Sequence, residues 1–490
     1  MKFISDFFRS SIFFWAAWVI IPILMEVLPT VADFFILLKK RIFHKKEEQQ
    51  DFFPEITLIV PVYNSADSLY RCIESIHNSD YDNELIYILL VNNMSTDNSF
   101  EVFCQCQKDF PGLTINWVNS RQGKSKALNL GLFNSYGKYI IHIDSDGVLH
   151  KDALRNMVLK FEQDPGIQCM TGTIMTNPEM IDGTKGFFKR QFRKLEFFEY
   201  CQAFLAGRNF QSEFNNIFTL SGAFSAFRKS SILKTQLYNT ETVCEDTHVT
   251  FQIRDMRKER VALCVDAIFF VDPIEDMNRL YIQRQRWQRG ELEVMHMFKK
   301  ERMSAVKGFL SSFIIRLVMF DHTFAFPRMI WYFALICLGF INYPFSLIIQ
   351  SVFVMYLLYV FSSVLLYFCI VMFLWKFEDL RKYYARKWYL VFFLPLYNFL
   401  IFWFRFAGII NSIKGASTWK MRNFTEEKEV VKKIVKKDFL WFTTLLEALR
   451  REVNVQEGKQ AEAPKEQAEF KIRIKRRKRR EKWINGQLKI

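Results

Sequence analysis

Short apolar runs alternate with helix-forming stretches in the first third of this 490-residue chain. The apolar runs occupy residues 57–62, 85–91, 113–118 and 138–143. Helix-forming stretches follow at residues 66–77, from Asp97 and from Gly123. Continuous apolar strands separated by helices are typical of a parallel sheet covered on both faces. The sequence therefore predicts an α/β domain whose ligands bind where loops leave the carboxyl ends of the strands.

A long apolar segment precedes this domain. Half of all residues are apolar and Phe occurs 53 times, which favours a lipid-facing surface. Residues 12–38 are long enough to cross a bilayer and too long for a cleavable signal sequence. The basic run that follows is expected in the cytosol. We therefore predict a transmembrane segment with a basic cytosolic flank at residues 1–46, and a cytosolic domain at residues 51–300.

Apolar segments return after residue 300. Residues 305–326 carry Arg316, Asp321 and His322, which favours an amphipathic helix in the membrane interface. Spanning helices are expected at residues 329–349, 351–375 and 389–412. We assign residues 301–413 to interfacial and transmembrane helices, and residues 414–490 to a basic cytosolic tail.

The number of these spans conflicts with the side of the membrane on which the basic tail is expected. Three crossings after a cytosolic domain would place the tail outside, although it ends in a dense Lys and Arg run. Either residues 305–326 also cross, or one later segment enters the membrane without crossing it. The sequence leaves both alternatives open.

Charge and cysteine content narrow the class of partner. The formal net charge of +16 fits a basic surface beside anionic lipid headgroups better than a nucleic-acid partner. The nine cysteines show no zinc-binding pattern, because Cys104 and Cys106 have no matching second pair. We expect all nine to be reduced packing residues.

Two carboxylates follow the last of the four predicted strands. Asp144 and Asp146 are separated only by Ser145, so their oxygens can converge on one divalent cation. Mg²⁺ and Mn²⁺ prefer such oxygen ligands. A pair of this kind is on its own more often a turn cap, but its position at a strand end in an α/β domain favours a metal site.

Polar loops also end the three preceding strands. They contain Pro61, Tyr63 and Asn64 after the first strand, Asn92 and Asn93 after the second, and Gly123 and Lys124 after the third. Each loop alone is an ordinary turn or helix cap. Together they open onto one rim, where helix N-termini suit a diphosphate.

Later segments complete a familiar order of motifs. Residues 220–224 read Leu-Ser-Gly-Ala-Phe, residues 244–246 read Cys-Glu-Asp, residues 283–287 read Gln-Arg-Gln-Arg-Trp, and residues 418–422 retain Trp419 and Arg422 of a W-G-T-R element. This order resembles family-2 glycosyltransferases, especially the membrane synthases of hyaluronan, chitin, cellulose and poly-N-acetylglucosamine. A narrower resemblance is to the exosortase G-associated glycosyltransferases of Gram-positive bacteria. The resemblance implies a GT-A-like, Rossmann-type cytosolic domain between N- and C-terminal transmembrane helices.

The resemblance also implies roles for the matched residues. Asp246 is expected to be the catalytic base, with Glu245 beside it to orient or tune it. The expected nucleotide-sugar ligands are Pro61, Tyr63, Asn64, Asn92, Lys124, Asp144 and Ser145. The expected acceptor or diphosphate ligands are Ser221, Gly222, Gln283, Arg286, Trp287, Trp419 and Arg422. Asp144 and Asp146 would hold the metal. Many relatives have Asp-Asp in place of Asn92-Asn93, which leaves the base preference open.

The leading hypothesis is an inverting glycosyltransferase that depends on Mg²⁺ or Mn²⁺. It would transfer sugar from a nucleotide sugar, expected to be UDP-linked, to a growing extracellular glycan. The alternatives are transfer of one sugar to a lipid-linked acceptor, or a catalytically silent scaffold for a glycan synthase. Expected partners are the donor, a glycan or lipid-linked acceptor, membrane lipids and an accessory membrane protein, with no nucleic acid. The expected location is the cell membrane, as a multi-pass protein with a cytosolic catalytic domain.

Overall fold

The computed structural model describes residue 23 and residues 27–43, 52–298, 333–335, 337, 339–340, 344–413 and 424–429. Residues 1–421 form one compact unit and residues 422–490 a second. Of the second unit, the structure describes residues 424–429, which are helical. The following paragraphs concern the first unit.

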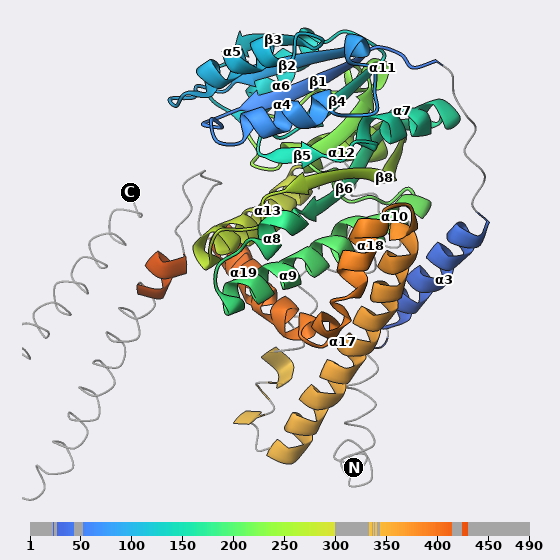
Figure 1. Ribbon diagram of the computed structural model, residues 1–490. Coiled ribbons are helices and arrows are strands. Elements are labelled where there is room, and N and C mark those ends of the chain that lie inside the picture. The colour runs from blue at the N-terminus through green and yellow to red at the C-terminus, as the bar shows by residue number, and fades with distance from the viewer. Residues whose placement is uncertain are drawn as a thin grey trace, which may run out of the picture. The chain divides into compact units, whose positions relative to one another are not determined.

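An eight-stranded sheet forms the centre of this unit (Figure 1). Its strands are β1 (Ile56–Val62), β2 (Ile86–Asn92), β3 (Thr114–Asn119), β4 (Tyr139–Ile143), β5 (Gly147–Leu149), β6 (Ile167–Thr176), β7 (Phe224–Arg228) and β8 (Arg260–Val271). Their order across the sheet is β3-β2-β1-β4-β7-β6-β8-β5. The first four in that order are parallel, as predicted, so their carboxyl ends form one rim.

The other half of the sheet is mixed. β7 is antiparallel to both β4 and β6, β6 is parallel to β8, and β5 is antiparallel to β8. The parallel arrangement predicted from four apolar runs is therefore confirmed for those strands and does not extend to the rest of the sheet, because an apolar run does not encode the direction of its strand. The β4–β7 pairing aligns Ile143 with Phe224. It thereby brings the loop after β4 beside the loop before β7, where Asp144 N donates to Ala223 O at 3.0 Å.

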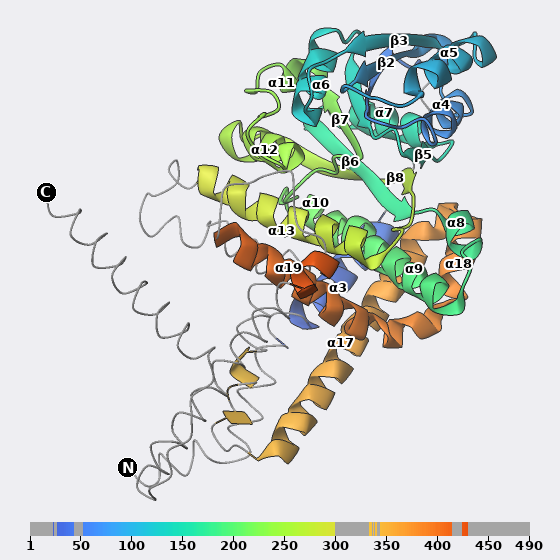
Figure 2. The ribbon, with the colours of Figure 1, turned by 90° about the vertical axis from the view of Figure 1, so that its left-hand side faces the viewer.

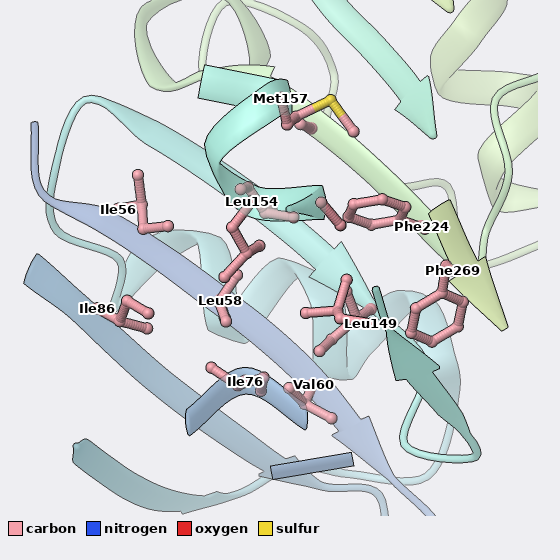
Figure 3. Close-up of a cluster of buried hydrophobic side chains, with 14 of the residues drawn as sticks. Ile56, Leu58, Val60, Ile76, Ile86, Leu149, Leu154, Met157, Phe224 and Phe269 are labelled. Atoms are coloured by element: carbon pink, nitrogen blue, oxygen red, sulfur yellow. The ribbon is translucent and has the colours of Figure 1, made fainter. Parts of the chain in front are cut away.

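Helices cover both faces of the sheet. They are α4 (Leu69–His77), α5 (Ser99–Asp109), α6 (Lys124–Phe133), α7 (Ala153–Gln163), α8 (Pro178–Asp182), α9 (Phe187–Tyr200), α10 (Arg208–Glu213), α11 (Lys229–Ile232), α12 (Glu245–Phe251) and α13 (Met277–Phe298). Short 3-10 or π-helical turns occupy Asn83–Leu85, Cys201–Gly207 and Gln252–Met256. Alternate side chains of β1 point to opposite faces, so Leu58 packs with α4 and α7 and Ile59 with α6. Figure 3 shows the first of these two cores, with Leu58, Leu154 and Phe224 among its labelled members.

Every cysteine lies in the described part and is free of disulfide bonds there. Seven of the nine are buried, which fits the predicted packing role. Cys104 is half-buried and Cys337 is exposed, so the packing prediction does not hold for Cys337.

Four further helices lie beside the domain, with α17 extending away from the sheet (Figures 1 and 2). They are α3 (Leu28–Ile42), α17 (Phe345–Phe373), α18 (Glu378–Ala385) and α19 (Leu394–Ile413), with 3-10 turns at Leu374–Lys376 and Trp388–Phe392. By length and composition, two segments of the described chain could cross a membrane: Phe345–Lys376 and Leu394–Asn411.

The expected break between two spanning helices near residue 350 is wrong. α17 runs without interruption from Phe345, after Pro344 at its N-cap, to Phe373. Its sequence contains no Gly or Pro, and Ser351 Oγ donates to Leu347 O at 2.8 Å, so its hydroxyl is satisfied inside the helix. The expected interfacial helix at 305–326 and most of the expected span at 12–38 lie outside the described residues.

The basic end of α3 contacts the domain directly. Lys40 Nζ donates to Asn209 Oδ1 at 2.6 Å and pairs with Glu213 Oε1 at 2.5 Å, both on α10. One residue on, the Arg41 guanidinium lies 4.1 Å from the centre of the Trp375 ring. The basic flank therefore fastens α3 to α10 and to the end of α17.

Candidate active site

Asparagines connect the loops at the ends of β1 and β2. Asn64, at φ +51°, accepts a hydrogen bond from Thr96 N at 2.8 Å. Asn92 Oδ1 accepts from Ser95 N at 2.8 Å. These contacts fix the first two loops of the rim to each other. Tyr63 projects beside them and is exposed.

The side-chain amide of Asn92 continues the network to β3. Its Nδ2 donates to Asn119 Oδ1 at 2.9 Å, and Trp117 Nε1 donates to the same oxygen at 3.1 Å. The Asn92 oxygen is therefore occupied within the protein, and its nitrogen already donates one bond. The sequence prediction did not include Trp117 or Asn119, although both belong to the strand that ends at this rim.

Asn93 holds the turn that opens α6. Gly123, at φ +130°, donates its backbone N–H to Asn93 Oδ1 at 2.6 Å. A positive φ of this size strongly favours glycine. The turn delivers Lys124 to the first position of the helix, so Asn93 serves a positioning role that the sequence prediction missed.

Lys124 joins the loops from both halves of the sheet. Its ammonium donates to Asp144 Oδ1 at 2.5 Å and to Gly222 O at 3.3 Å. Burial alone would lower the pKa of Lys124, but the charges of Asp144, Glu245 and Asp246 outweigh it and raise the pKa. One ammonium therefore offsets part of the negative charge of a cluster of carboxylates.

Asp144 and Asp146 are the oxygen ligands that the sequence predicted for a metal. Asp146 is open to solvent on one side, yet crowding by protein atoms and the nearby Asp144 charge raise its pKa to about 6. Among the described residues no group of three or more His, Cys, Asp or Glu side chains could hold a metal ion. Mg²⁺ and Mn²⁺ commonly take one or two carboxylates plus substrate oxygens, so this pair fits such an ion. Ser145 lies between them with its Oγ 2.7 Å from Ser65 Oγ.

Asp246 stands at the start of α12, opposite the loop before β7. Its Oδ2 accepts from Gly222 N at 3.2 Å, and its Oδ1 accepts from Thr247 N at 2.7 Å. A Cβ added to Gly222 would lie 3.1 Å from Asp246 Oδ2, so glycine permits this close approach. The neighbouring Glu245 is buried, and burial raises its pKa to about 7, with Lys124 opposing the rise and Asp246 adding to it.

The Gln283–Trp287 motif lies on α13. Trp287 packs edge-on against Phe204, at 6.0 Å between ring centres, and the Arg284 guanidinium lies 4.3 Å from the centre of its ring. Gln283 Nε2 donates to Tyr200 OH at 3.4 Å. Arg286 is exposed. A half-buried Trp face beside an exposed Arg is an arrangement that can bind a sugar ring and an anion.

Arg284 is the functional candidate that the motif prediction passed over. It is fully buried, and its Nη2 donates to Glu199 Oε2 at 2.5 Å. The same oxygen accepts from Tyr397 OH of α19 at 3.2 Å. The sequence feature that could have pointed to Arg284 was Glu199, a carboxylate among the apolar residues at the end of α9. A buried carboxylate rarely lacks a partner of opposite charge.

α13 is seated directly against the loop that leads to Asp246. A Cβ on Gly290 would lie 1.9 Å from Cys244 Sγ, and the Cys244 thiol donates to Arg286 O at 3.9 Å. The structure thus gathers Lys124, Asp144, Gly222, Glu245 and Asp246 at one centre with α13 alongside.

The structure also describes the contacts of two further predicted site residues, Ser221 and Pro61. Ser221 N donates to Thr171 Oγ1 at 3.0 Å, which ties its loop to β6. Pro61 is half-buried within β1 opposite Val91. Trp419 and Arg422 lie outside the described residues.

The sheet order and the polar strand ends define a GT-A-like α/β fold. A mannosyltransferase from Pyrobaculum calidifontis, solved with GDP-Man and Mn²⁺, has a similar fold, with a TM-score of 0.51 and 17% identity over 74% of this chain and 99% of that one. Residues 57–235 match the family described as Glycosyl transferase family 2. Residues 57–235 are therefore a glycosyltransferase family 2 region, and the chain is distantly related to poly-β-1,6-N-acetyl-D-glucosamine synthases.

Two such synthases illustrate the relationship. The protein of Staphylococcus aureus (strain MSSA476) is 23% identical over 278 residues, and that of Staphylococcus epidermidis is 26% identical over 288 residues. Each match covers 56% of this chain and 64% of the relative. The chain therefore spans slightly less than two thirds of the length of these relatives.

Proposed function

We propose that this protein is an inverting, metal-dependent polysaccharide synthase that uses a nucleotide sugar, with UDP as the expected carrier. The observation that carries the proposal is the meeting of Lys124, Asp144 and Asp246 at the carboxyl ends of the strands. A cation-binding pair, an ammonium and an oriented carboxylate are the groups that transfer from a nucleoside diphosphate requires. The relationship to poly-β-1,6-N-acetyl-D-glucosamine synthases supports the substrate class.

Asp246 is the proposed base. Hydrogen bonds from Gly222 N and Thr247 N fix the positions of both of its oxygens. The carboxylate would accept the proton of the acceptor hydroxyl as that oxygen bonds to the anomeric carbon. The bond from that carbon to the diphosphate breaks on the opposite side, and the nucleoside diphosphate leaves with its electron pair. The configuration of the sugar is thereby inverted.

Asp144 and Asp146 would hold Mg²⁺ or Mn²⁺, which when bound neutralises charge on the diphosphate. Lys124 lies close enough to share in that task, since it contacts Asp144 and the Gly222 carbonyl. Glu245, close to Asp246 and with a raised pKa, would tune the charge of the base. The remaining proposed donor ligands are Pro61, Tyr63, Asn64, Asn92 and Ser145.

The acceptor would approach from the side of α13. Trp287 offers a ring face, and Gln283, Arg286 and the loop with Ser221 offer polar contacts. Trp419 and Arg422 are proposed to join this side. The protein would lie in the cell membrane with its catalytic domain in the cytosol, extending a glycan toward the outside with an accessory membrane protein as partner.

A second candidate is the transfer of one sugar to a lipid-linked acceptor. It is favoured by the small number of candidate spans, since only two segments of the described chain are long and apolar enough to cross a membrane. A passage for a growing glycan normally needs several helices around it.

One experiment tests these proposals. The full chain in lipid nanodiscs is offered UDP- and GDP-sugars with Mg²⁺ or Mn²⁺, and nucleotide release and product length are measured. The test variant is Asp246→Asn, and the matched control is Glu101→Gln, an exposed carboxylate on α5. Long product supports the synthase, and a lipid bearing one sugar supports the second candidate. Nucleotide release that is absent, or equal in Asp246→Asn and wild type, refutes the assignment of the base.

A further inference from the structure

Two neighbouring strands at one edge of the sheet, β2 and β3, each end in an asparagine (Figure 1). Asn92 and Asn119 are partners in the parallel pairing of these strands, and Asn92 Nδ2 donates to Asn119 Oδ1 at 2.9 Å. Ser120 N donates to Asn92 O at 2.8 Å, which ties the backbone after β3 to the end of β2. The two side-chain amides therefore form one fixed polar edge.

The contacts of these amides decide which of their atoms is oxygen and which is nitrogen. Ser95 N, which can only donate, contacts Asn92 Oδ1 at 2.8 Å. The indole Nε1 of Trp117, which also can only donate, contacts Asn119 Oδ1 at 3.1 Å. A flip of either amide would set two donors against each other. Both side-chain oxygens therefore face the protein.

Aromatic packing holds the indole of Trp117 in place. The rings of Phe100 and Phe103 on α5 lie 5.4 Å and 5.3 Å from the Trp117 ring, measured between centres. Phe103 is buried and Trp117 is half-buried between strand and helix. Rotation of the indole would break these contacts, so its N–H stays on Asn119. Trp117 is therefore a positioning residue for the Asn119 amide.

The outer side of this edge offers only hydrogen-bond donors. Among the residues that the structure describes, Asn119 Nδ2 has no acceptor, and Asn92 Nδ2 uses one of its two hydrogens on Asn119. Asn119 is exposed and Asn92 is half-buried, so a ligand on the rim can reach them. A carbonyl oxygen can accept from such N–H groups, whereas an amino group would meet them donor to donor.

The edge lies where the base of a bound donor would be. The proposed function places the diphosphate at Lys124 and Asp144 and the reacting sugar at Asp246. Asp246 lies beside the loop before β7, on one side of β4, whereas β1, β2 and β3 follow on the other side. The nucleoside would therefore extend toward β2 and β3, two to three strand spacings of about 4.8 Å away. The part of the base farthest from the ribose would then meet the asparagines.

We propose that Asn92 and Asn119 select the base of the donor by donating to the O4 carbonyl of uracil. Cytosine has an amino group at that position, which would face the two donors without an acceptor. The inference rests on the proposed function, which places the diphosphate and thereby the base. A well-formed neutral hydrogen bond corresponds to about tenfold in affinity, so UDP should bind about tenfold more tightly than CDP.

The test measures the binding of UDP and CDP by calorimetry on the full chain in lipid nanodiscs with Mn²⁺, without a glycan acceptor. Asn119→Asp keeps the inner oxygen that Trp117 and Asn92 contact and replaces the outer nitrogen with an oxygen. That oxygen accepts from the amino group of cytosine and repels O4 of uracil. The preference for UDP should therefore fall about tenfold, toward equal affinity. The matched control is Asn98→Asp, which adds the same charge at an exposed position on the same rim and should leave the preference unchanged.

A second variant, Trp117→Phe, tests the orientation of the Asn119 amide. Phenylalanine keeps an aromatic ring against α5 but lacks the indole N–H, so the amide of Asn119 becomes free to flip. The preference for UDP should fall about threefold. A role in strand packing alone would weaken UDP and CDP binding equally, so an unchanged preference refutes the positioning role of Trp117.

Failure of the donor site and failure of base selection give different results. Absence of UDP binding to the wild type in Mn²⁺ rejects the proposed donor site and this inference with it. UDP binding accompanied by equal CDP affinity rejects base selection alone. Base selection is also rejected by a preference that Asn119→Asp leaves unchanged, or that Asn98→Asp lowers to the same extent.

Discussion

Replacement of Glu245 with Gln should make the melting temperature of the protein less dependent on pH. Burial raises the pKa of this carboxyl from 4.5 to about 7, while Lys124 opposes the rise and Asp246 adds to it. Because the pKa is raised in the folded state, the stabilisation is present below pH 4.5 and is lost as the pH rises through 7. Glutamine occupies the same space and does not titrate.

The size of the effect follows from the two pKa values. At about 1.4 kcal/mol for each pKa unit, ionising this buried carboxyl costs about 3 kcal/mol. Most of that cost, about 2–3 kcal/mol, develops between pH 5 and pH 8. For a domain of this size it corresponds to a loss of about 4–12 °C in melting temperature. Wild-type protein should show this loss, and Glu245→Gln should lack it.

Melting of the full chain in nanodiscs is followed by tryptophan fluorescence at pH 5, 6, 7 and 8. Glu101→Gln, on the exposed surface of α5, is the control and should follow the wild type at every pH. Other titrating groups contribute equally to all three proteins, so the difference between their slopes isolates Glu245. A slope for Glu245→Gln as steep as that of the wild type would refute the account of its burial.

Three further substitutions test contacts that hold the fold together, by thermal melting. Arg284→Met leaves the Glu199 carboxylate buried without its cation and should cost about 3–5 kcal/mol; adding Glu199→Gln should restore part of the loss, and no recovery would contradict the pairing. Gly137→Ala should cost more than about 1 kcal/mol, because φ is +77° and the new Cβ would lie 2.4 Å from a backbone oxygen; Gly112→Ala, which meets no described atom within 4 Å, should cost less. Lys40→Met should cost about 0.5–1 kcal/mol by removing a partly exposed ion pair with α10, and an unchanged melting temperature would mean that α3 is held by apolar contacts alone.

The parallel half of the sheet was predictable because each of its strands is an apolar run at a spacing that leaves room for one helix. The antiparallel half was not. β7 pairs with both β4 and β6 through contacts between segments far apart in the sequence, and no local pattern encodes such a choice. The error near residue 350 has a local cause, since the Ser351 hydroxyl bonds to Leu347 O and the helix continues.

The site was predictable to the extent that its residues sit at strand ends. Periodicity could not decide which arginine of the α13 motif faces the domain. The motif singled out Arg286, which is exposed, whereas Arg284 is buried against Glu199 and Trp287. The positioning role of Asn93 was missed for a related reason: its contact, Gly123 N, lies 30 residues further along the chain.

The charges at the site imply that donor and cation depend on each other. Asp144, Asp146, Glu245 and Asp246 are balanced in the described structure mainly by Lys124, whose ammonium lies 2.5 Å from Asp144 Oδ1. Burial is the main cause of the raised pKa values of Asp146, about 6, and Glu245, about 7, and the neighbouring carboxylates raise both further. A diphosphate brought to this cluster without a divalent cation would meet repulsion. Protonation of Asp146 below about pH 6 would remove a proposed cation ligand, so donor affinity should fall with acidification even though the cluster becomes less negative.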